Sequence, residues 1–394
     1  MSTDEQADLP DVRVALVLAT SAGGVGRHVR SMAAGLARRG ARVAVLAPAP
    51  TGELFGFAAA GTRFEAVDIA DRPRPVQDAR AVARLRSLLS GADIVHAHGL
   101  RAGGLAALAI KSLRSGPPLV VTLHNAAPAG GVAGTAYAVL ERVVARTAAG
   151  VLGVSPDLER RMREMGARSV ARALVPAPPA HVVGPSARLD IRTELGVGHR
   201  PLILTVARLA EQKGLPTLLD AAAGWARRDL RPLVAIVGDG PLEGVLRARI
   251  EREDLPVRLL GRRTDVAELL AAADVAVMPS VWEGQPLVLQ EILRAGRPLV
   301  ATRVGGVAAL LGEPDEAAGP GNPDNPESPV HPDGAGVLVP AGDPAALETA
   351  VNRILDDPGL AVRLGAAAAQ RAVALPTEAD AVDQLARLYR GLVD

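Results

Sequence analysis

Short apolar segments alternate with longer segments of helical periodicity along most of the chain. In the first half, the segments predicted to be buried strands are residues 12–19, 42–46, 94–97, 119–123 and 151–154. In the second half, they are residues 202–206, 233–237, 257–260, 275–278, 299–302 and 337–339. Continuous apolar strands separated by helices are typical of parallel sheets that helices cover on both faces. The pattern therefore predicts an α/β protein with two doubly wound, Rossmann-like domains.

Proline and glycine divide this pattern into domains. Residues 175–199 are rich in both and interrupt the alternation, so they are interpreted as a linker region. The expected organisation is a disordered tail, a first domain, a linker and a second domain, at residues 1–10, 11–180, 181–200 and 201–375. Residues 312–336 hold six prolines and few apolar positions, which predicts a surface loop inserted in the second domain. Ligands of such folds bind beyond the carboxyl ends of the strands, and a cleft between the two domains is the expected site.

Composition excludes several classes of protein. Hydrophobic residues make up 48% of the 394 residues and charged residues 22%, as in an ordinary globular protein. The absence of cysteine excludes disulfides, cysteine-ligated metals and thiol nucleophiles. No apolar run is long enough to span a membrane, and the acidic first ten residues do not resemble a signal peptide. We therefore expect a cytoplasmic protein.

The net charge of +1 hides an uneven distribution of charge. Residues 71–172 carry 15 Lys/Arg and 7 Asp/Glu, whereas the rest of the chain carries 29 and 36. Aromatic residues are only 2% of the chain, so stacking platforms for nucleic acid are not expected, and nucleic acid is excluded as a partner. The basic half consists either of ordinary solvated helix faces or of a surface that contacts an acidic acceptor or the inner face of an anionic membrane.

The second domain opens with two cations after its first strand. Arg208 and Lys213 follow the segment 202–206, where they could clamp a diphosphate. The chain contains only two lysines, Lys111 and Lys213, so a lysine at this position is notable in a sequence that otherwise uses arginine. The alternative is a lysine in a solvated loop.

Two glutamates spaced eight residues apart form the densest chemical signal. Glu283 lies in the loop after the segment 275–278, and Glu291 lies about two turns into the next predicted helix. The free amides at the start of that helix, near Leu287 and Val288, could face an anion. Glu291 lies on an apolar helix, where an unpaired carboxylate is costly, so it is expected to accept hydrogen bonds from ligand hydroxyls. Two surface glutamates are the alternative.

Glycine-rich turns and histidines also follow predicted strands. Gly23 and Gly24 come after the first strand, and each of the other turns, at Gly238 and at Gly261–Arg262, follows a strand of the second domain. Each of them could approach a phosphate or simply form a tight turn. His124 directly follows the segment 119–123 and is expected to face the cleft. His96 and His98 offer only weak support for a metal site, and metal-free charge neutralisation is favoured.

Together these residues resemble the GT-B glycosyltransferases of family 4, a large retaining group. Glu283 and Glu291 match that family's E-x7-E motif, and Arg208 and Lys213 match its R-L-x-x-x-K-G motif. The remaining matches, in chain order, are Gly23-Gly24-x-x-x-His28, His96-Ala-His98, Thr122-Leu-His124, Val154-Ser155, Gly238-Asp-Gly-Pro241 and Arg303-Val-Gly305-Gly306. The resemblance covers about residues 11–375, and the family's C-terminal helix, here within 376–394, would cross back to the first domain.

The resemblance implies a role for each matched residue. Arg208 and Lys213 would bind the donor diphosphate and stabilise the leaving group, and Glu283 would contact the donor sugar beside His124. Glu291 would hold the ribose hydroxyls. The other donor contacts would be Gly23, Gly24, Gly238, Gly261, Arg262 and the amides of Leu287 and Val288.

The implied activity is a retaining, metal-independent transfer of a sugar from a nucleoside-diphosphate sugar, UDP rather than GDP, without any other cofactor. The acceptor stays open between a small molecule, a lipid-linked compound and a polysaccharide. Two departures from the family pattern are Gly284-Gln285-Pro286, where many members have Gly-Phe-Gly, and Pro176-Ala-Pro-Pro-Ala180 at the end of the first domain. The alternative functions are a sugar-nucleotide epimerase of the same fold and a non-catalytic partner subunit.

Overall fold

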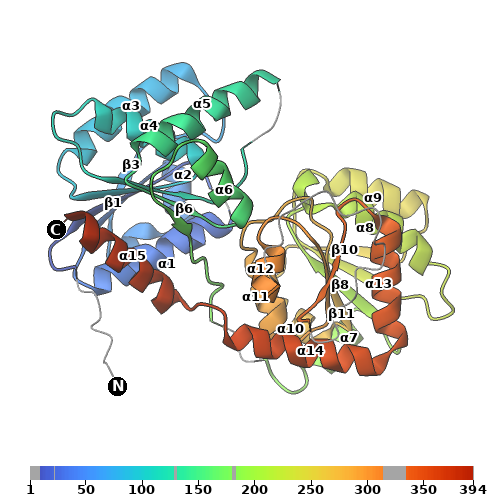
Figure 1. Cartoon of the computed structure of the whole chain (residues 1–394). Coiled ribbons are helices and arrows are strands. Elements are labelled where there is room, and N and C mark those ends of the chain that lie inside the picture. Colours follow the sequence, from blue (N-terminus) through green and yellow to red (C-terminus); the bar gives the residue numbers. More distant parts are fainter. Residues whose placement is uncertain (1–8, 22, 128–130, 180–182, 314–333, 394) are drawn as a thin grey trace, which may run out of the picture. The chain divides into compact units, whose positions relative to one another are not determined.

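The computed structural model describes residues 9–21, 23–127, 131–179, 183–313 and 334–393 (Figure 1). It divides into two compact units: residues 1–176 with 376–394, and residues 177–375. Both are α/β units built on a parallel sheet, which confirms the predicted fold class.

The first unit holds a seven-stranded sheet in the order β3-β2-β1-β4-β5-β6-β7. Its strands are β1 (Arg13–Leu18), β2 (Arg42–Ala47), β3 (Arg63–Ala66), β4 (Ile94–His98), β5 (Leu119–Leu123), β6 (Gly150–Gly153) and β7 (Val170–Arg172). Its helices are α1 (Gly24–Arg38), α2 (Ala49–Phe55), the 3-10 turn η1 (Phe57–Ala60), α3 (Pro75–Leu89), α4 (Leu100–Lys111), α5 (Gly131–Thr147), α6 (Pro156–Glu164) and α15 (Glu378–Val393). In Figure 1, α3, α4 and α5 cover one face of the sheet, and α1 and α15 cover the other.

The second unit holds a six-stranded sheet in the order β10-β9-β8-β11-β12-β13. Its strands are β8 (Leu202–Val206), β9 (Leu233–Val237), β10 (Val257–Gly261), β11 (Val275–Met278), β12 (Leu299–Thr302) and β13 (Val337–Val339). Its helices are α7 (Ala187–Glu194), the 3-10 turn η2 (Glu211–Lys213), α8 (Leu215–Trp225), α9 (Glu243–Arg252), α10 (Val266–Ala272), α11 (Leu287–Arg294), α12 (Val307–Leu311), α13 (Pro344–Asp356) and α14 (Pro358–Val373).

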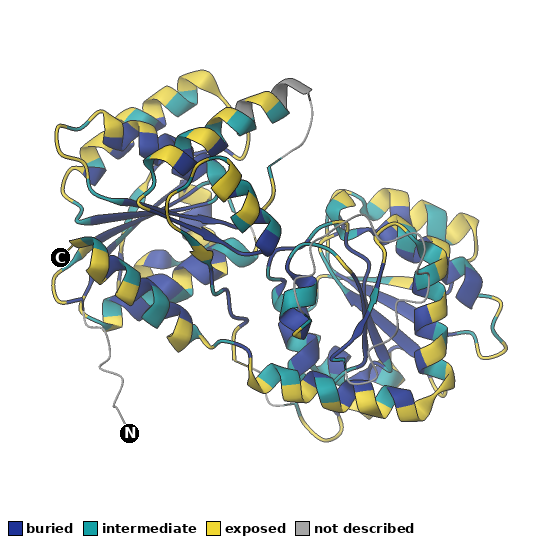
Figure 2. Ribbon diagram, viewed as in Figure 1, coloured by how far each residue is buried: buried dark blue, intermediate teal, exposed yellow. Residues whose placement is uncertain are grey.

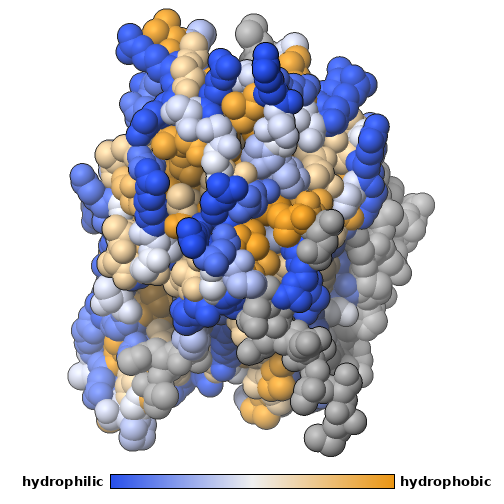
Figure 3. All heavy atoms as spheres, turned by 90° about the vertical axis from the view of Figure 1, so that its left-hand side faces the viewer, coloured by the Kyte–Doolittle hydropathy of each residue, from blue (hydrophilic) through white to orange (hydrophobic). Residues whose placement is uncertain are grey.

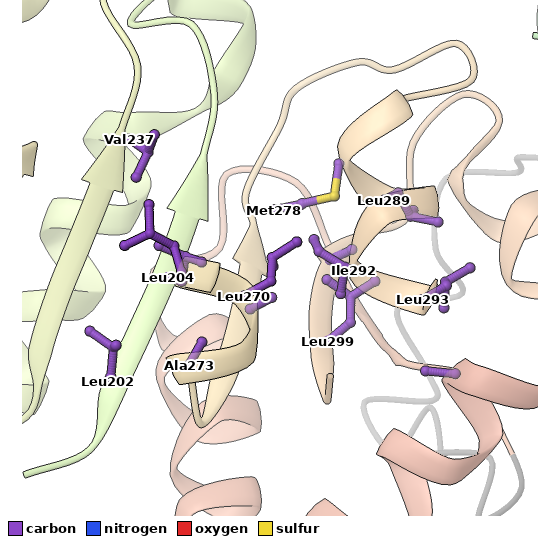
Figure 4. Close-up of a cluster of buried hydrophobic side chains, with 14 of the residues drawn as sticks. Leu202, Leu204, Val237, Leu270, Ala273, Met278, Leu289, Ile292, Leu293 and Leu299 are labelled. Atoms are coloured by element: carbon purple, nitrogen blue, oxygen red, sulfur yellow. The ribbon is translucent and has the colours of Figure 1, made fainter. Parts of the chain in front are cut away.

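Burial explains why the central strands are apolar without alternation. All five residues of β4, of β5 and of β9 are buried, because helices pack on both faces of each sheet. Figure 2 shows the strands in the colour of buried residues and the outer helix faces as exposed. In the second unit, α11 packs its Leu289, Ile292 and Leu293 into the cluster drawn in Figure 4. This packing fixes the helix that carries Glu291.

The segment expected to be a linker, residues 181–200, contains a helix instead. Helix α7 belongs to the second unit, where Arg188 and Arg192 each form an ion pair with Asp274, at 2.7 and 3.0 Å. Proline and glycine flank this helix but leave its interior free, so the prediction of a continuous linker was wrong.

Smaller elements of the first unit were also missed. Strands β3 and β7 have no buried positions and lie at the two edges of this sheet. They therefore lack the apolar runs by which the central strands were predicted. Ser155, of the Val154-Ser155 match, directly precedes α6, and its hydroxyl makes no capping hydrogen bond.

Two other expectations fall largely outside the described residues. Most of the predicted tail, residues 1–8, and most of the predicted insertion, residues 314–333, lie there. Leu9, by contrast, is buried, and its N–H donates to the Arg39 carbonyl. The last residues of the predicted tail are therefore part of the first unit.

Candidate functional site

The residues predicted for donor binding in the second unit lie at one edge of its sheet. Arg208 follows β8, Lys213 ends η2, and Glu283 lies between β11 and α11. Gly238 follows β9, and Gly261 ends β10 with Arg262 next. The strands β10, β9, β8 and β11 are parallel neighbours, so their carboxyl ends bring these loops to the same edge, where doubly wound folds bind ligands.

Lys213 and Glu283 are in direct contact at this edge. The Lys213 ammonium donates a hydrogen bond to Oε1 of Glu283 at 2.6 Å, and the Ser280 hydroxyl donates to the same oxygen at 2.7 Å. The side chain of Glu283 is 6% exposed and that of Lys213 is 20% exposed. A buried carboxylate needs such partners, because burial of an unpaired charge is costly. The pair is therefore held in place before any ligand arrives.

Backbone contacts fix the two loops that carry this pair. The Gln212 side-chain amide donates to the Trp282 carbonyl at 2.9 Å, and the Val281 N–H donates to the Gln212 carbonyl at 2.8 Å. These bonds tie the loop after β8 to the loop after β11. The 70 residues that separate Lys213 from Glu283 in the sequence are thus bridged at two places beside the ion pair.

Two glycines allow close approach of backbone around the site. Gly305 has a φ of +52°, and a Cβ there would lie 1.7 Å from the carbonyl oxygen of Glu283. Gly238 has a φ of +138°, and a Cβ there would lie 2.0 Å from the carbonyl oxygen of Ala207. Side chains other than hydrogen cannot be accommodated at such distances, so both positions require glycine.

The remaining predicted donor residues are partly or fully accessible. Arg208 and Arg262 are exposed, and Glu291 is half-buried on α11. Leu287 and Val288 are the first two residues of α11, so their N–H groups lack acceptors within the helix. These groups share the sheet edge with the Lys213–Glu283 pair, and the Gly238 N–H donates to the Gly261 carbonyl at 2.8 Å at the same edge.

The predicted residues of the first unit lie at the carboxyl edge of its own sheet. Gly23 precedes α1 and Gly24 begins it, after β1, and His124 follows β5. Gly23 is exposed, and a Cβ at this position would meet nothing within 4 Å. Steric crowding therefore does not require glycine at Gly23.

Four buried imidazoles pack together at this edge of the first unit. His96 and His98 come from β4, His28 comes from α1, and His124 follows β5. The ring centres of His96 and His98 are stacked at 4.3 Å, and those of His98 and His124 at 5.4 Å. The ring of His28 stands edge-on to those of His98 and His124 at 5.9 and 5.7 Å.

Hydrogen bonds connect this histidine cluster, defined as His28, His96, His98 and His124, to its surroundings. His96 is bonded through Nδ1 to the Tyr389 hydroxyl of α15, and through Nε2 to the Thr122 hydroxyl at 2.7 Å. Nδ1 of His98 and Nε2 of His124 are 3.1 Å apart. The described parts of the chain contain no group of three or more His, Asp or Glu arranged to hold a metal ion.

Burial keeps the histidine cluster uncharged at neutral pH. Desolvation lowers the pKa of His28 to about 4. Desolvation also lowers the pKa of His96, to about 3, and the nearby His28 contributes to that shift. Desolvation and the neighbouring imidazoles hold the pKa of His98 and of His124 well below the usual range. Burial raises the pKa of Tyr389, so its hydroxyl stays protonated.

Sequence reasoning missed the supporting roles of three side chains. Ser280 holds Glu283, and Thr122 and Tyr389 hold His96. Tyr389 is 293 residues away from His96 in the sequence, so no local pattern could connect them. Its signal was composition: it is one of two tyrosines in the chain and lies on the apolar face of an amphipathic helix.

Family models match both units. The model described as "Glycosyl transferase 4-like domain" matches residues 23–178, and "Glycosyl transferases group 1" matches residues 200–357. With the fold and the matched site, these place the protein in the class of GT-B glycosyltransferases. The chain belongs to the family 4-like group of that class.

Curated relatives agree with this assignment. The chain is 31% identical to the D-inositol 3-phosphate glycosyltransferase of Kineococcus radiotolerans over 71% of this chain and 67% of that protein. It is also 31% identical to the alpha-D-kanosaminyltransferase of Streptomyces kanamyceticus, although that match spans 52% of this chain and only 49% of the relative.

Solved structures share the fold. HepE of Anabaena, in complex with UDP-glucose, is 21% identical with a TM-score of 0.77, over 96% of this chain and all of that one. The sucrose-phosphate synthase of Thermosynechococcus elongatus is 21% identical with a TM-score of 0.75, over 97% and 99%. In the described part of this chain, no helix combines the length and apolar character that a membrane crossing requires.

Proposed function

We propose that the protein transfers a sugar from a nucleoside-diphosphate sugar to an acceptor with retention of anomeric configuration and without a metal ion. The observation that carries the proposal is the Lys213–Glu283 ion pair, with Arg208 on the preceding loop, at the carboxyl edge of the second sheet. An ammonium has three N–H donors, and Glu283 takes one of them. The other two are available to diphosphate oxygens.

Fixed positive charge is the proposed source of catalysis. Departure of the nucleoside diphosphate builds negative charge on its oxygens, and cations that are already in place stabilise that charge. Lys213 is held by Glu283, and Arg208 is exposed to receive a second phosphate oxygen. We propose that these two cations perform the neutralisation for which other transferases use a divalent metal.

The remaining predicted residues receive their roles from the family resemblance. Glu291 would accept hydrogen bonds from the ribose hydroxyls, and Gly261 with Arg262 would contact the base. Gly23, Gly24 and Gly238, with the amides of Leu287 and Val288, would line the phosphates. Glu283 would contact the donor sugar, and His124 would contact the same sugar.

Retention is proposed to occur by attack on the face from which the diphosphate leaves. A double displacement needs a free carboxylate nucleophile. Oε1 of Glu283 already accepts hydrogen bonds from Lys213 and Ser280, which reduces its nucleophilicity. In the proposed step, the departing phosphate oxygen takes the proton of the acceptor hydroxyl as the acceptor oxygen bonds to the anomeric carbon.

A uridine donor is favoured, and the acceptor is left as a hydroxyl compound. The HepE structure contains UDP-glucose, and a relative from Escherichia coli is named for UDP-Gal as donor. These names support UDP over GDP here. The relatives' names differ in the acceptor, from inositol phosphate to a diphosphoundecaprenol compound.

The outer surface of α3, α4 and α5 is proposed to contact an anionic membrane on the cytoplasmic side. These helices carry seven Lys/Arg and two Asp/Glu, and both carboxylates, Asp78 and Glu141, are paired with arginines. The exposed cations of this basic layer without a defined ion pair are Arg80, Arg86, Lys111, Arg142 and Arg146. Figure 3 shows hydrophilic side chains with hydrophobic ones among them at the top, where this layer lies. Clustered cations are attracted to anionic lipid.

The proposed function is tested with UDP-, GDP- and ADP-sugars and no added acceptor. A bound donor should raise the melting temperature, and slow hydrolysis should follow, with water as acceptor. Proton NMR of the freshly released sugar should show the anomer of the donor, and EDTA should not change the rate. Release of the opposite anomer, or loss of activity with EDTA, would contradict the mechanism. Formation of an epimeric nucleotide sugar would favour the epimerase instead.

A further inference from the structure

The hydrogen bond between His98 and His124 uses Nδ1 of His98 and Nε2 of His124. The nitrogens outside this bond are Nε2 of His98 and Nδ1 of His124. Nε2 of His98 and Nδ1 of His28 are both enclosed, and neither has a hydrogen-bond partner. Nδ1 of His124, within the described residues, is neither enclosed in this way nor hydrogen-bonded, and His124 is 8% exposed. His124 therefore presents its Nδ1 side toward the outside of the histidine cluster.

A neutral imidazole carries one proton, so the shared bond links the tautomers of the two rings. If His98 donates from Nδ1, its enclosed Nε2 is a bare acceptor and His124 carries its proton on Nδ1. If His124 donates from Nε2, His98 must carry its proton on the enclosed Nε2, and His124 presents a bare Nδ1. Among buried backbone groups, an N–H without an acceptor is rarer than a carbonyl with an unused lone pair. Applied to the enclosed Nε2 of His98, the same preference favours the first arrangement.

We infer that His98 is a positioning residue that holds His124 as the Nδ1–H tautomer, so that His124 presents a hydrogen-bond donor to an oxygen of the substrate. The inference rests on the proposed function for the identity of that substrate. It assigns His124 the role of a donor to a hydroxyl or ring oxygen of the sugar, and it excludes His124 as a general base.

The C-terminal helix holds His98 in place through His96. The His96 ring is bonded at both nitrogens, to Tyr389 of α15 and to Thr122 of β5, so it cannot rotate without breaking a buried hydrogen bond. His98 stacks on this fixed ring at 4.3 Å with 27° between the planes. Tyr389 and His96 thus fix the orientation of the His98 ring, and His98 determines which nitrogen of His124 carries the proton.

Two substitutions of His98 separate its hydrogen bond from its volume. In His98→Asn, the amide nitrogen lies near the position of Nδ1 and can still donate to His124. In His98→Leu, the bulk remains and the donor is lost. His199→Asn is the control, because His199 is an exposed histidine of the second unit.

Long-range proton–nitrogen NMR of protein with labelled histidine reports the tautomer directly, with signals assigned by loss in single variants. The wild-type protein and His98→Asn should show His124 with a protonated Nδ1 and a bare Nε2. His98→Leu should lose this preference, with kcat/KM for the sugar nucleotide reduced by up to about 10²-fold. UDP affinity, which is expected to depend mainly on Lys213 and Arg208 of the second unit, should be unchanged. An unchanged circular dichroism spectrum would show that the variant is folded in both units.

The tautomer can be measured without substrate, so its test is independent of the proposed function. A proton on Nε2 of His124 in the wild-type protein would overturn the inference, and so would an unchanged His124 tautomer in His98→Leu. Absence of UDP binding in the wild-type protein would instead contradict the proposed function and leave the tautomer result standing.

Discussion

At the scale of single residues, the two proposed sites differ in how their polar groups are satisfied. In the second unit, opposite charges meet, since Lys213 and Ser280 both donate to one oxygen of Glu283. In the first unit, four imidazoles are buried without any opposite charge among their hydrogen-bond partners. The first arrangement suits an anionic ligand, whereas the second keeps its ionisable groups neutral.

The histidine cluster predicts a loss of stability in acid. Its folded-state pKa values are depressed, to about 4 for His28 and about 3 for His96, whereas unfolded histidine titrates near 6.5. The stabilising contribution is therefore fully present above pH 6.5 and is lost as the pH falls from 6.5 toward the folded values. Each such histidine should lower the free energy of unfolding by about 1.4 kcal/mol per pH unit in this window.

Urea unfolding between pH 7 and pH 5 measures this effect in the first unit. The variant His28→Asn should show a slope with pH that is smaller by about 1.4 kcal/mol per unit, and His199→Asn should keep the wild-type slope. An unfolding free energy that does not fall between pH 6.5 and pH 5 would show that the cluster is not buried and neutral.

The sequence correctly predicted which functional side chains follow strands, but it could not predict their hydrogen-bond partners. Arg208, Lys213 and Glu283 each follow a strand that an apolar run predicts, so their shared edge was expected. The direct bond between Lys213 and Glu283 was not, because it depends on the order of β8 and β11 in the sheet. Tyr389 could not be assigned for the same reason, since its partner His96 lies on another element.

At the scale of elements, apolar runs predicted every strand of the second sheet and the central strands of the first, but they failed at the two edges of the first sheet. β5 and β9 were predicted to the residue, because both are buried on two sides. β3 and β7 have partly exposed side chains and no continuous apolar run. Helix α7 was missed because the prolines and glycines around it suggested a linker.

The basic layer of α3, α4 and α5 predicts binding to anionic vesicles. The triple variant Arg80→Glu, Arg86→Glu and Arg146→Glu should lose most cosedimentation with phosphatidylglycerol vesicles, because each cation near such a surface contributes roughly 1 kcal/mol. The triple variant with glutamate at Arg227, Arg353 and Arg363, exposed cations of the second unit, makes the same change in charge and should bind like the wild-type protein.

Salt and lipid composition sharpen the vesicle experiment. Binding should weaken as ionic strength rises, and neutral phosphatidylcholine vesicles should not bind. An equal loss of vesicle binding in both triple variants would mean that the overall charge of the protein, rather than this basic layer, attracts it to the vesicles. No binding of the wild-type protein to anionic vesicles would contradict the proposed membrane contact.

At the scale of the whole molecule, the chain forms two α/β units, and the C-terminal helix completes the first of them. α15 packs against α1, and Gln384 on it donates to the Arg172 carbonyl and accepts from the Leu174 N–H, at 2.8 and 3.1 Å. Arg39, directly after the end of α1, forms a further ion pair with Asp383 of α15. The histidine cluster of the first unit therefore depends on the last residues of the chain through Tyr389.

The central claim is that fixed cations at the sheet edge of the second unit bind the diphosphate of a sugar nucleotide. Isothermal titration calorimetry with UDP tests it most directly, in the wild-type protein, in Lys213→Ala and in the control Arg227→Ala. Loss of one charge-assisted contact should weaken UDP binding by roughly 10- to 100-fold in Lys213→Ala, while Arg227→Ala should bind like the wild-type protein. Equal affinity in all three proteins would contradict the account.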